Sequence, residues 1–306
     1  MPLEYQLANV LPIDSLVQCL SYSPDGEFLA FASVTGNIFV ISGSSQEPRF
    51  RVQAHNPVLT LKWVKEPSGN HLWCGLANGL LLCIAVRPGS IAVAAFMMLP
   101  VGISGLALDP SRALFAVGGQ SALKIWRIIS LHDLSKSALT LHPTVLHPPA
   151  PSEEVQLRLL DWLNTGKYEG CLLISFANHG MICWDPESSS PRWSVNFETP
   201  IVSPLNDMVV VANTVDGLDI YSLPPGSHLR SIKYAASTSS RDRLPARFMH
   251  EGLAIMASTA LGTVNLWLID SGCALHRLQC NGKLVTEFNV SASGYHRNCS
   301  TIIYTC

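Results

Sequence analysis

The stretch Ser21-Tyr22-Ser23-Pro24-Asp25-Gly26-Glu27-Phe28-Leu29-Ala30 connects an alternating segment to an apolar one through a polar turn. Residues 17–22 and 27–33, on either side of the turn, have the composition of β-strands. Proline, aspartate and glycine are typical of the turn between them. A second tight turn at Gly36 leads into a third apolar segment, residues 37–41. The stretch therefore predicts consecutive antiparallel strands joined by short turns.

The same unit recurs five more times along the chain. Its tight turns between the second and third strands fall at residues 36, 79, 121, 180, 217 and 262, at intervals of 43, 42, 59, 37 and 45 residues. Four of the five intervals are close to the ~40–45 residues of a four-stranded propeller blade. The long interval contains residues 131–152, which include four prolines. We interpret this segment as an insertion beside an outer strand, because proline cannot donate to a sheet ladder.

Composition excludes several classes of protein. Of the 306 residues, 48% are hydrophobic and 14% are charged, which is unlike a disordered chain. The net charge of -2 argues against a protein that binds nucleic-acid backbones. The longest apolar run, residues 91–99, is much shorter than the ~20 residues of a membrane helix. We expect no nucleic acid or membrane partner and, because the N-terminus lacks a signal-peptide pattern, an intracellular location, either cytoplasmic or nuclear.

The repeats resemble the WD-repeat family. Residues 21–30 are similar to its first-strand and turn consensus, and Gly262-Thr263-Val264-Asn265-Leu266-Trp267 to its third strand. Leu123-Lys124-Ile125-Trp126 and Cys183-Trp184-Asp185 are further third-strand matches. His55 stands where the family places the histidine of its Gly-His dipeptide, but Ala54 replaces the glycine. Other copies depart from the pattern where tryptophan is usual, at Ile41, Ile84 and Tyr221.

The resemblance and the repeat spacing together predict an all-β fold. We expect a seven-bladed β-propeller of four-stranded antiparallel blades that forms a single domain over residues 1–306. Residues 284–290 and 300–306 would be the first two strands of the seventh blade, whose third strand is missing. As is common in the family, an N-terminal strand, residues 3–10, would join that blade and close the ring. Blades of this kind bury both sheet faces against their neighbours, which accounts for apolar strands such as residues 28–32.

The sequence lacks a recognisable catalytic or cofactor motif. The nearest match to a nucleophile elbow, residues 119–123, lacks the final glycine and leads into a strand rather than a helix. There is also no glycine-rich phosphate loop and no His-Glu-x-x-His motif. The nine cysteines include no Cys-x-x-Cys pair, so most are expected to be buried apolar residues. We therefore expect no enzyme activity, no cofactor and no metal.

The resemblance implies a non-catalytic scaffold that binds a protein or peptide on one face of the propeller. In WD-repeat proteins that face is formed by the loops between blades and by the turns between second and third strands. By position, these loops hold His55, Asn56, Asn78, Gln120, His179 and Asp216. Two other readings stay open. One is a propeller hydrolase with a polar site in the central channel, and the other is one scaffold module of a larger signalling or assembly protein.

Overall fold

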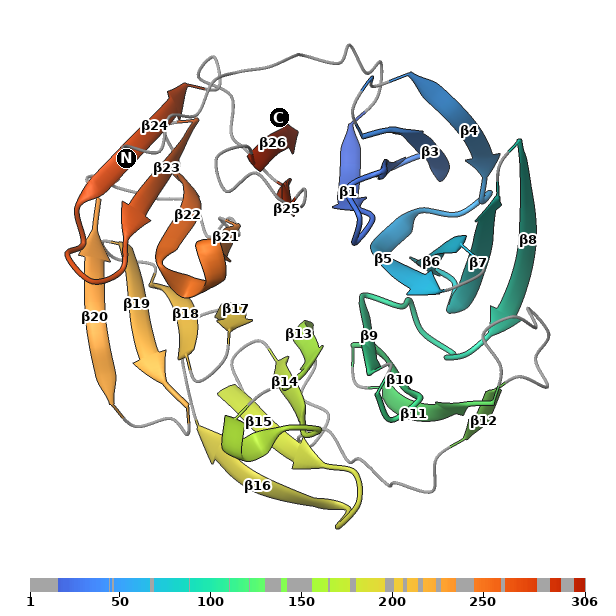
Figure 1. Cartoon of the computed structure of the whole chain (residues 1–306). Coiled ribbons are helices and arrows are strands. Elements are labelled where there is room, and N and C mark those ends of the chain that lie inside the picture. The colour runs from blue at the N-terminus through green and yellow to red at the C-terminus, as the bar shows by residue number, and fades with distance from the viewer. Residues whose placement is uncertain are drawn as a thin grey trace. The chain divides into compact units, whose positions relative to one another are not determined.

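The computed structural model describes most of the chain as short β-strands (Figure 1). The described residues are 16–43, 45, 47–66, 69–87, 89–109, 111–120, 122–129, 139–141, 156–164, 166–176, 180–195, 201–205, 208–213, 217–223, 227–234, 245–259, 262–279, 287–292 and 300–305. The only helical segments among them are two three-residue 3-10 turns, Gly166–Tyr168 and His250–Gly252. The chain divides into two compact units. The N-terminal unit comprises residues 11–160 and 289–303, and the C-terminal unit comprises residues 1–10, 161–288 and 304–306.

The N-terminal unit contains three four-stranded antiparallel sheets. In each sheet the strands follow one another in chain order, as the repeats predict. The first sheet is β1 (Val17–Tyr22), β2 (Phe28–Ser33), β3 (Asn37–Ser42) and β4 (Pro48–Gln53). The second is β5 (Val58–Glu66), β6 (Gly69–Leu76), β7 (Leu80–Arg87) and β8 (Ser90–Met97). The third is β9 (Gly105–Asp109), β10 (Leu114–Gly119), β11 (Ala122–Ile128) and β12 (Leu139–Leu141).

Three further sheets of the same kind follow along the chain. The fourth is β13 (Leu157–Trp162), β14 (Leu172–Phe176), β15 (Gly180–Asp185) and β16 (Ser190–Val195). The fifth is β17 (Ile201–Leu205), β18 (Met208–Asn213), β19 (Gly217–Ser222) and β20 (His228–Lys233). The sixth is β21 (Ala246–Met249), β22 (Ala254–Thr259), β23 (Thr263–Leu268) and β24 (Ala274–Gln279). All-β architecture and four-stranded antiparallel blades are thus confirmed.

The expectation of seven blades is wrong, because the structure has six. After the sixth sheet the described residues form only β25 (Glu287–Ala292) and β26 (Ser300–Thr305), which pair with each other as a two-stranded sheet. Two strands expose too much of both faces to form a blade of their own. Residues 3–10, expected to close that blade, lie outside the described residues. So does most of the 131–152 insertion, of which β12 is the described part.

Three of the apolar clusters lie between two neighbouring blades rather than within one. One cluster joins Ile38 and Val40 of the first blade to Leu72 and Ile84 of the second. Corresponding clusters join the second blade to the third and the fifth to the sixth. Because both faces of a blade pack in this way, second strands such as β10 are buried at every position. Burial of one such side chain contributes about 1.5–3 kcal/mol, so neighbouring blades stabilise one another.

The first two blades are also joined by Trp63 of β5. Its ring stacks on Phe28 of β2 at a centroid distance of 6.0 Å, and its indole N–H donates to the Ser21 carbonyl at 2.9 Å. First strands are neighbours within each unit: β1 contacts β5, β5 contacts β9, and in the C-terminal unit β17 contacts β21. Fourth strands such as β4 alternate between exposed and half-buried residues, as expected of a sheet edge.

Candidate partner-binding surface

Strand order divides the loops of every blade between two ends. Because the four strands run antiparallel in sequence, the turn between the second and third strands lies at the end where the fourth strand leaves for the next blade. We call this the linker end. The turns between first and second strands and between third and fourth strands lie at the opposite end. Of the residues that the sequence singled out for partner binding, the described ones belong to a linker end, namely His55, Asn56, Asn78 and Gln120.

The linker between the first two blades, residues 54–57, is fastened by backbone hydrogen bonds at both of its ends. The Ala54 N–H donates to the Gly36 carbonyl in the β2–β3 turn at 2.9 Å. The Pro57 carbonyl accepts from the Ala77 N–H in the β6–β7 turn, also at 2.9 Å. The linker is therefore held to both blades without using a side chain.

Glycine at position 36 allows this contact. Its φ of 82° is in the left-handed region, and a Cβ atom built on it would overlap the carbonyl oxygen of Asn56. The next linker is built in the same way. The N–H groups of Met98 and Leu99 donate to the Gly79 carbonyl at 3.1 and 3.3 Å, and a Cβ at Gly79 would overlap the Leu99 carbonyl.

Four of the six predicted binding residues lie at the linker end of the N-terminal unit. His55 and Gln120 are exposed and have positive φ angles of 58° and 40°. Asn56 is half-buried beside Gly36, and Asn78 is exposed, with its Oδ1 accepting the Leu80 N–H at 3.2 Å. Main-chain hydrogen bonds of Ala54, Ala77 and Gly79 hold the backbone beside His55, Asn56 and Asn78. His179 and Asp216 lie outside the described residues, so their predicted roles stay predictions.

The opposite end of the first blade carries a side-chain network that the sequence did not reveal. Asp25 Oδ1 accepts from the Ser23 hydroxyl at 2.6 Å and from the Glu27 N–H at 3.1 Å, which closes the β1–β2 turn. Its Oδ2 reaches the second blade, accepting from Asn70 Nδ2 at 3.0 Å and lying 3.2 Å from Lys65 Nζ.

Electrostatics at Asp25 follow from these contacts. Burial raises the pKa of the carboxyl, but the hydrogen bonds from Ser23, Asn70, the Glu27 N–H and Lys65 favour the charged form more strongly. The net effect lowers the pKa of Asp25 to about 2. Asp25 is therefore a charged link between two blades rather than a proton donor at neutral pH.

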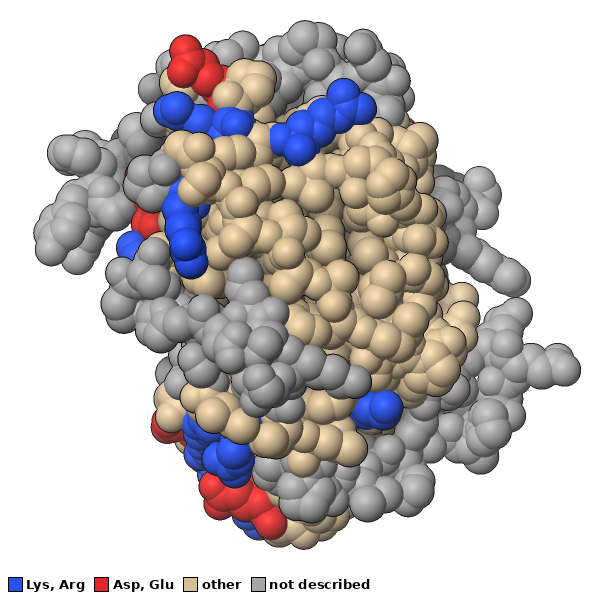
Figure 2. Space-filling view, turned by 90° about the vertical axis from the view of Figure 1, so that its right-hand side faces the viewer, with Lys and Arg blue, Asp and Glu red and all other residues tan. Residues whose placement is uncertain are grey.

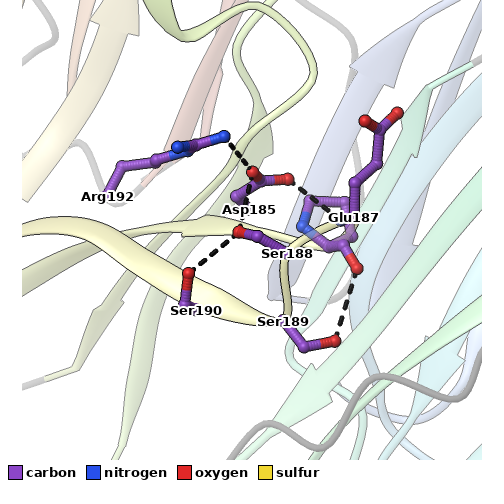
Figure 3. A network of polar contacts seen from close by, with 7 residues as sticks. Asp185, Glu187, Ser188, Ser189, Ser190 and Arg192 are labelled. Atoms are coloured by element: carbon purple, nitrogen blue, oxygen red, sulfur yellow. Dashed lines mark hydrogen bonds and ion pairs between the residues drawn. The ribbon is translucent and has the colours of Figure 1, made fainter.

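Asp185, the acidic residue of the Trp-Asp pair noted in the sequence, makes a local network instead (Figure 3). It ends β15 and accepts from the Glu187 N–H at 2.9 Å and from the Ser188 hydroxyl at 2.9 Å, while Arg192 of β16 pairs with its Oδ2. Burial raises the pKa of Asp185, but the two hydrogen bonds and the charge of Arg192 lower it below its usual range overall. All of these partners lie on one hairpin, so Asp185 stabilises its own blade.

Asp219, His228 and Ser231 come together on β19 and β20, an arrangement that the sequence search also missed. The Ser231 hydroxyl donates to Asp219 Oδ1 at 2.6 Å and lies 2.9 Å from His228 Nε2. Because the only hydroxyl proton points to the carboxylate, His228 must donate to Ser231. A hydrolytic triad needs the reverse, with the histidine accepting the serine proton and the carboxylate behind the histidine. The three residues thus have the composition of a triad but not its order.

Two searches of the described residues gave negative results. No three His, Cys, Asp or Glu side chains there are placed to hold a metal ion. No helix there has the length and apolar character needed to cross a membrane.

One protein-family model matches part of the chain. Residues 9–66 match the family model described as the anaphase-promoting complex subunit 4 WD40 domain. The matched range includes the whole first blade and β5, and therefore the 54–57 linker. No curated protein matches the chain.

WD-repeat propellers generally serve as platforms for protein interactions. The matched segment carries the Asp25 turn and the first linker, and the blade that it covers is repeated five more times in the structure. Taken together, the match over residues 9–66 and the repeated four-stranded sheets support a WD-repeat β-propeller family for the chain.

Proposed function

We propose that the chain is a non-catalytic scaffold that binds a protein or peptide at the linker end of its N-terminal unit. The observation that supports this is the backbone fastening of the linkers. The 54–57 and 98–104 segments are held by main-chain hydrogen bonds to the second-to-third-strand turns and to the ends of the second strands beside them. Side chains at this end are left to make contacts with a partner.

The residues at the linker end suit such a role. His55, Asn78 and Gln120 are exposed and offer both hydrogen-bond donors and acceptors without a fixed charge. The backbones beside His55 and Asn78 are already held by hydrogen bonds, so a partner that binds there does not bear the entropy cost of ordering these loops. Polar, uncharged groups of this kind suit the backbone amides and polar side chains of an extended peptide. We propose the corresponding role for His179 and Asp216 in the C-terminal unit, and an intracellular location is part of the proposal.

Comparative affinity purification tests the proposal. The bait would be the wild-type chain, a His55→Ala/Asn78→Ala/Gln120→Ala variant, and a Glu27→Ala/Glu47→Ala control that changes exposed side chains at the opposite end of the first blade. Proteins recovered with each bait would be quantified by mass spectrometry. We expect partners whose recovery falls at least about tenfold with the triple variant and is unchanged with the control. If every protein bound by the wild type were retained by the triple variant, binding at the linker end would be wrong.

The family match supports a second candidate, a scaffold subunit of a multi-protein assembly. The matched description names a subunit of the anaphase-promoting complex. Size-exclusion chromatography of cell extract would test this candidate, because a stable subunit elutes in a complex much larger than the isolated chain. Elution of all the protein at its own size would count against it.

A further inference from the structure

The fourth strand of the second blade, β8, is an unusual sheet edge. Four of the other fourth strands have six residues, and each of them carries at least one cationic side chain. These are Arg49 and Arg51 on β4, Arg192 on β16, Arg230 and Lys233 on β20, and Arg277 on β24. β8 has the sequence Ser90-Ile91-Ala92-Val93-Ala94-Ala95-Phe96-Met97, with eight residues and neither a charge nor a proline. Charges and prolines on an edge strand prevent pairing with another chain, so β8 lacks this protection.

The backbone of β8 is also more regular than that of the other edges. Pairing with the third strand is interrupted by a register shift in β4, β16, β20 and β24. β8 pairs with β7 over eight consecutive residues, from Leu80↔Met97 to Arg87↔Ser90, without a shift. A bulge twists an edge away from incoming strands, whereas a regular edge presents an unbroken row of free N–H and C=O groups. At about 3.4 Å per residue, the β8 edge is roughly 27 Å long.

The side chains of β8 leave apolar surface uncovered. Val93 is 47% exposed and Met97 55% exposed, and Ala95 between them is also exposed. Figure 2 faces the side of the N-terminal unit that carries β8 and shows a broad area without Lys, Arg, Asp or Glu between two groups of basic side chains. Among the described fourth strands, β8 therefore combines a free backbone edge with exposed apolar side chains.

We propose that β8 pairs antiparallel with β8 of a second copy of this chain, around a two-fold axis at Ala94. Edge-to-edge pairing about a two-fold axis keeps the faces of the two sheets aligned. A residue of one copy then stands opposite the residue of the other copy that lies equally far from the axis in the opposite direction along the strand. With the axis at Ala94, Val93 faces Ala95 of the second copy, and Phe96 faces Ala92. Each of these pairs sets a large side chain against a small one, as close packing requires.

Charge favours a second copy over other occupants. A two-fold contact pairs a strand with an identical strand, so the cations of a charged strand would lie near the cations of the other copy and repel them. β4 and β20, with two cations each, could not pair in this way, whereas uncharged β8 can. Among the described fourth strands, β8 is the only one with eight residues and no charge, so we expect the pairing to close at two copies rather than propagate. One strand pair is small beside a standard interface of about 1,200–2,000 Å², so we expect a dimer of micromolar affinity.

Sedimentation analysis of the purified chain over a concentration series tests the proposal. We expect the mass to rise from 33.2 kDa towards about twice that value as the concentration approaches about 100 µM. Val93→Lys should weaken the dimer at least about tenfold, because a buried lysine would face an apolar surface. Leu229→Lys is the matched control: Leu229 is 50% exposed on β20, and its replacement should leave dimerisation unchanged.

A double variant tests the register. In Val93→Lys/Ala95→Glu, the lysine of each copy would face the glutamate of the other, so dimerisation should recover relative to Val93→Lys alone. Circular dichroism of each variant would show that the strands are retained. The proposal is overturned if the wild type stays at the monomer mass at about 100 µM. That result would exclude pairing between two copies and would favour a strand of another protein as the occupant of the β8 edge. The proposal is equally overturned if Val93→Lys dimerises like the wild type, or if the double variant is no better than the single one.

Discussion

The two ends of the blades in the N-terminal unit are held together by different chemical groups. At the linker end, backbone N–H and C=O groups join residues 54–57 to the turns of two blades, and Gly36 leaves the space for this contact. At the opposite end, the blades are joined by side chains, with Asp25 bonded to Asn70 and Lys65. An end that is fixed through its backbone keeps its side chains available for a partner. An end that is fixed through side chains has already committed them to the fold.

The largest loss of stability is expected from a substitution that fills the space beside Gly36 at the linker end. Gly36→Ala should lower the free energy of unfolding by about 3 kcal/mol, because the new Cβ overlaps the Asn56 carbonyl and the backbone is left-handed. Gly89→Ala is the matched control, with a φ of 75° and no atom within 4 Å of the new Cβ, and should cost only about 1 kcal/mol. Urea unfolding followed by tryptophan fluorescence measures both. Equal losses would mean that the close approach of the linker contributes nothing.

A smaller loss is expected from removing the side-chain link at the opposite end. Asp25→Ala should cost about 2 kcal/mol, because the Asn70 amide, 5% exposed, loses its partner. Asp185→Ala should cost about 1 kcal/mol, because Arg192 has a side chain that is 54% exposed and can be hydrated instead. The same urea measurement compares the two variants. A larger loss for Asp185→Ala would show that links within a hairpin matter more than links between blades.

The contribution of Asp25 should also depend on pH. Its pKa is about 2 in the folded chain, below the ordinary value of 3.8, so the carboxylate stabilises the fold above about pH 4. This stabilisation is lost as the pH falls from about 4 to about 2 and the carboxyl takes up a proton in both states. The advantage of the wild type over Asp25→Asn should therefore shrink by about 1 kcal/mol over that range, allowing for partial exposure. A difference that stayed constant with pH would contradict the charged link.

The smallest effect is expected from the exposed side chains of the linker end. His55→Ala, Asn78→Ala and Gln120→Ala should each change the free energy of unfolding by less than about 0.5 kcal/mol. Thermal and urea unfolding of the three variants would measure this. A loss above about 1 kcal/mol for any of them would mean that the side chain is committed to the fold, which would weaken its assignment to partner binding.

Strand patterns predicted much of the fold because the repeated turns are visible in the sequence. Residues 27–33 were expected as a second strand, and β2 covers Phe28–Ser33. Even the final strands were placed within a few residues, at 300–306 against β26, Ser300–Thr305. The blade count was wrong because a repeat in the sequence shows that strands exist, not that a sheet is completed. β25 and β26 have the pattern of a blade but pair only as two strands.

The site was less predictable than the fold. Ser23, Asp25 and Gly26 could be recognised as turn residues, but the bond from Asp25 to Asn70 joins residues 45 positions apart and depends on how two blades pack. The close approach of Asn56 to Gly36 likewise depends on the path of a linker that has no motif of its own. Exposure of His55 could be expected from a loop position, whereas its left-handed backbone could not.

The hydrogen bonds between the first two blades indicate how the protein can fold while it is being synthesised. Three hydrogen bonds that involve side chains, from Asn70 to Asp25, from Trp63 to Ser21 and from Cys19 to Val58, span 45, 42 and 39 residues. None of these bonds needs a residue from a distant part of the polypeptide. Each sheet can therefore dock on the preceding one soon after both have left the ribosome. We expect such a nascent protein to become protease-resistant in steps of about one repeat.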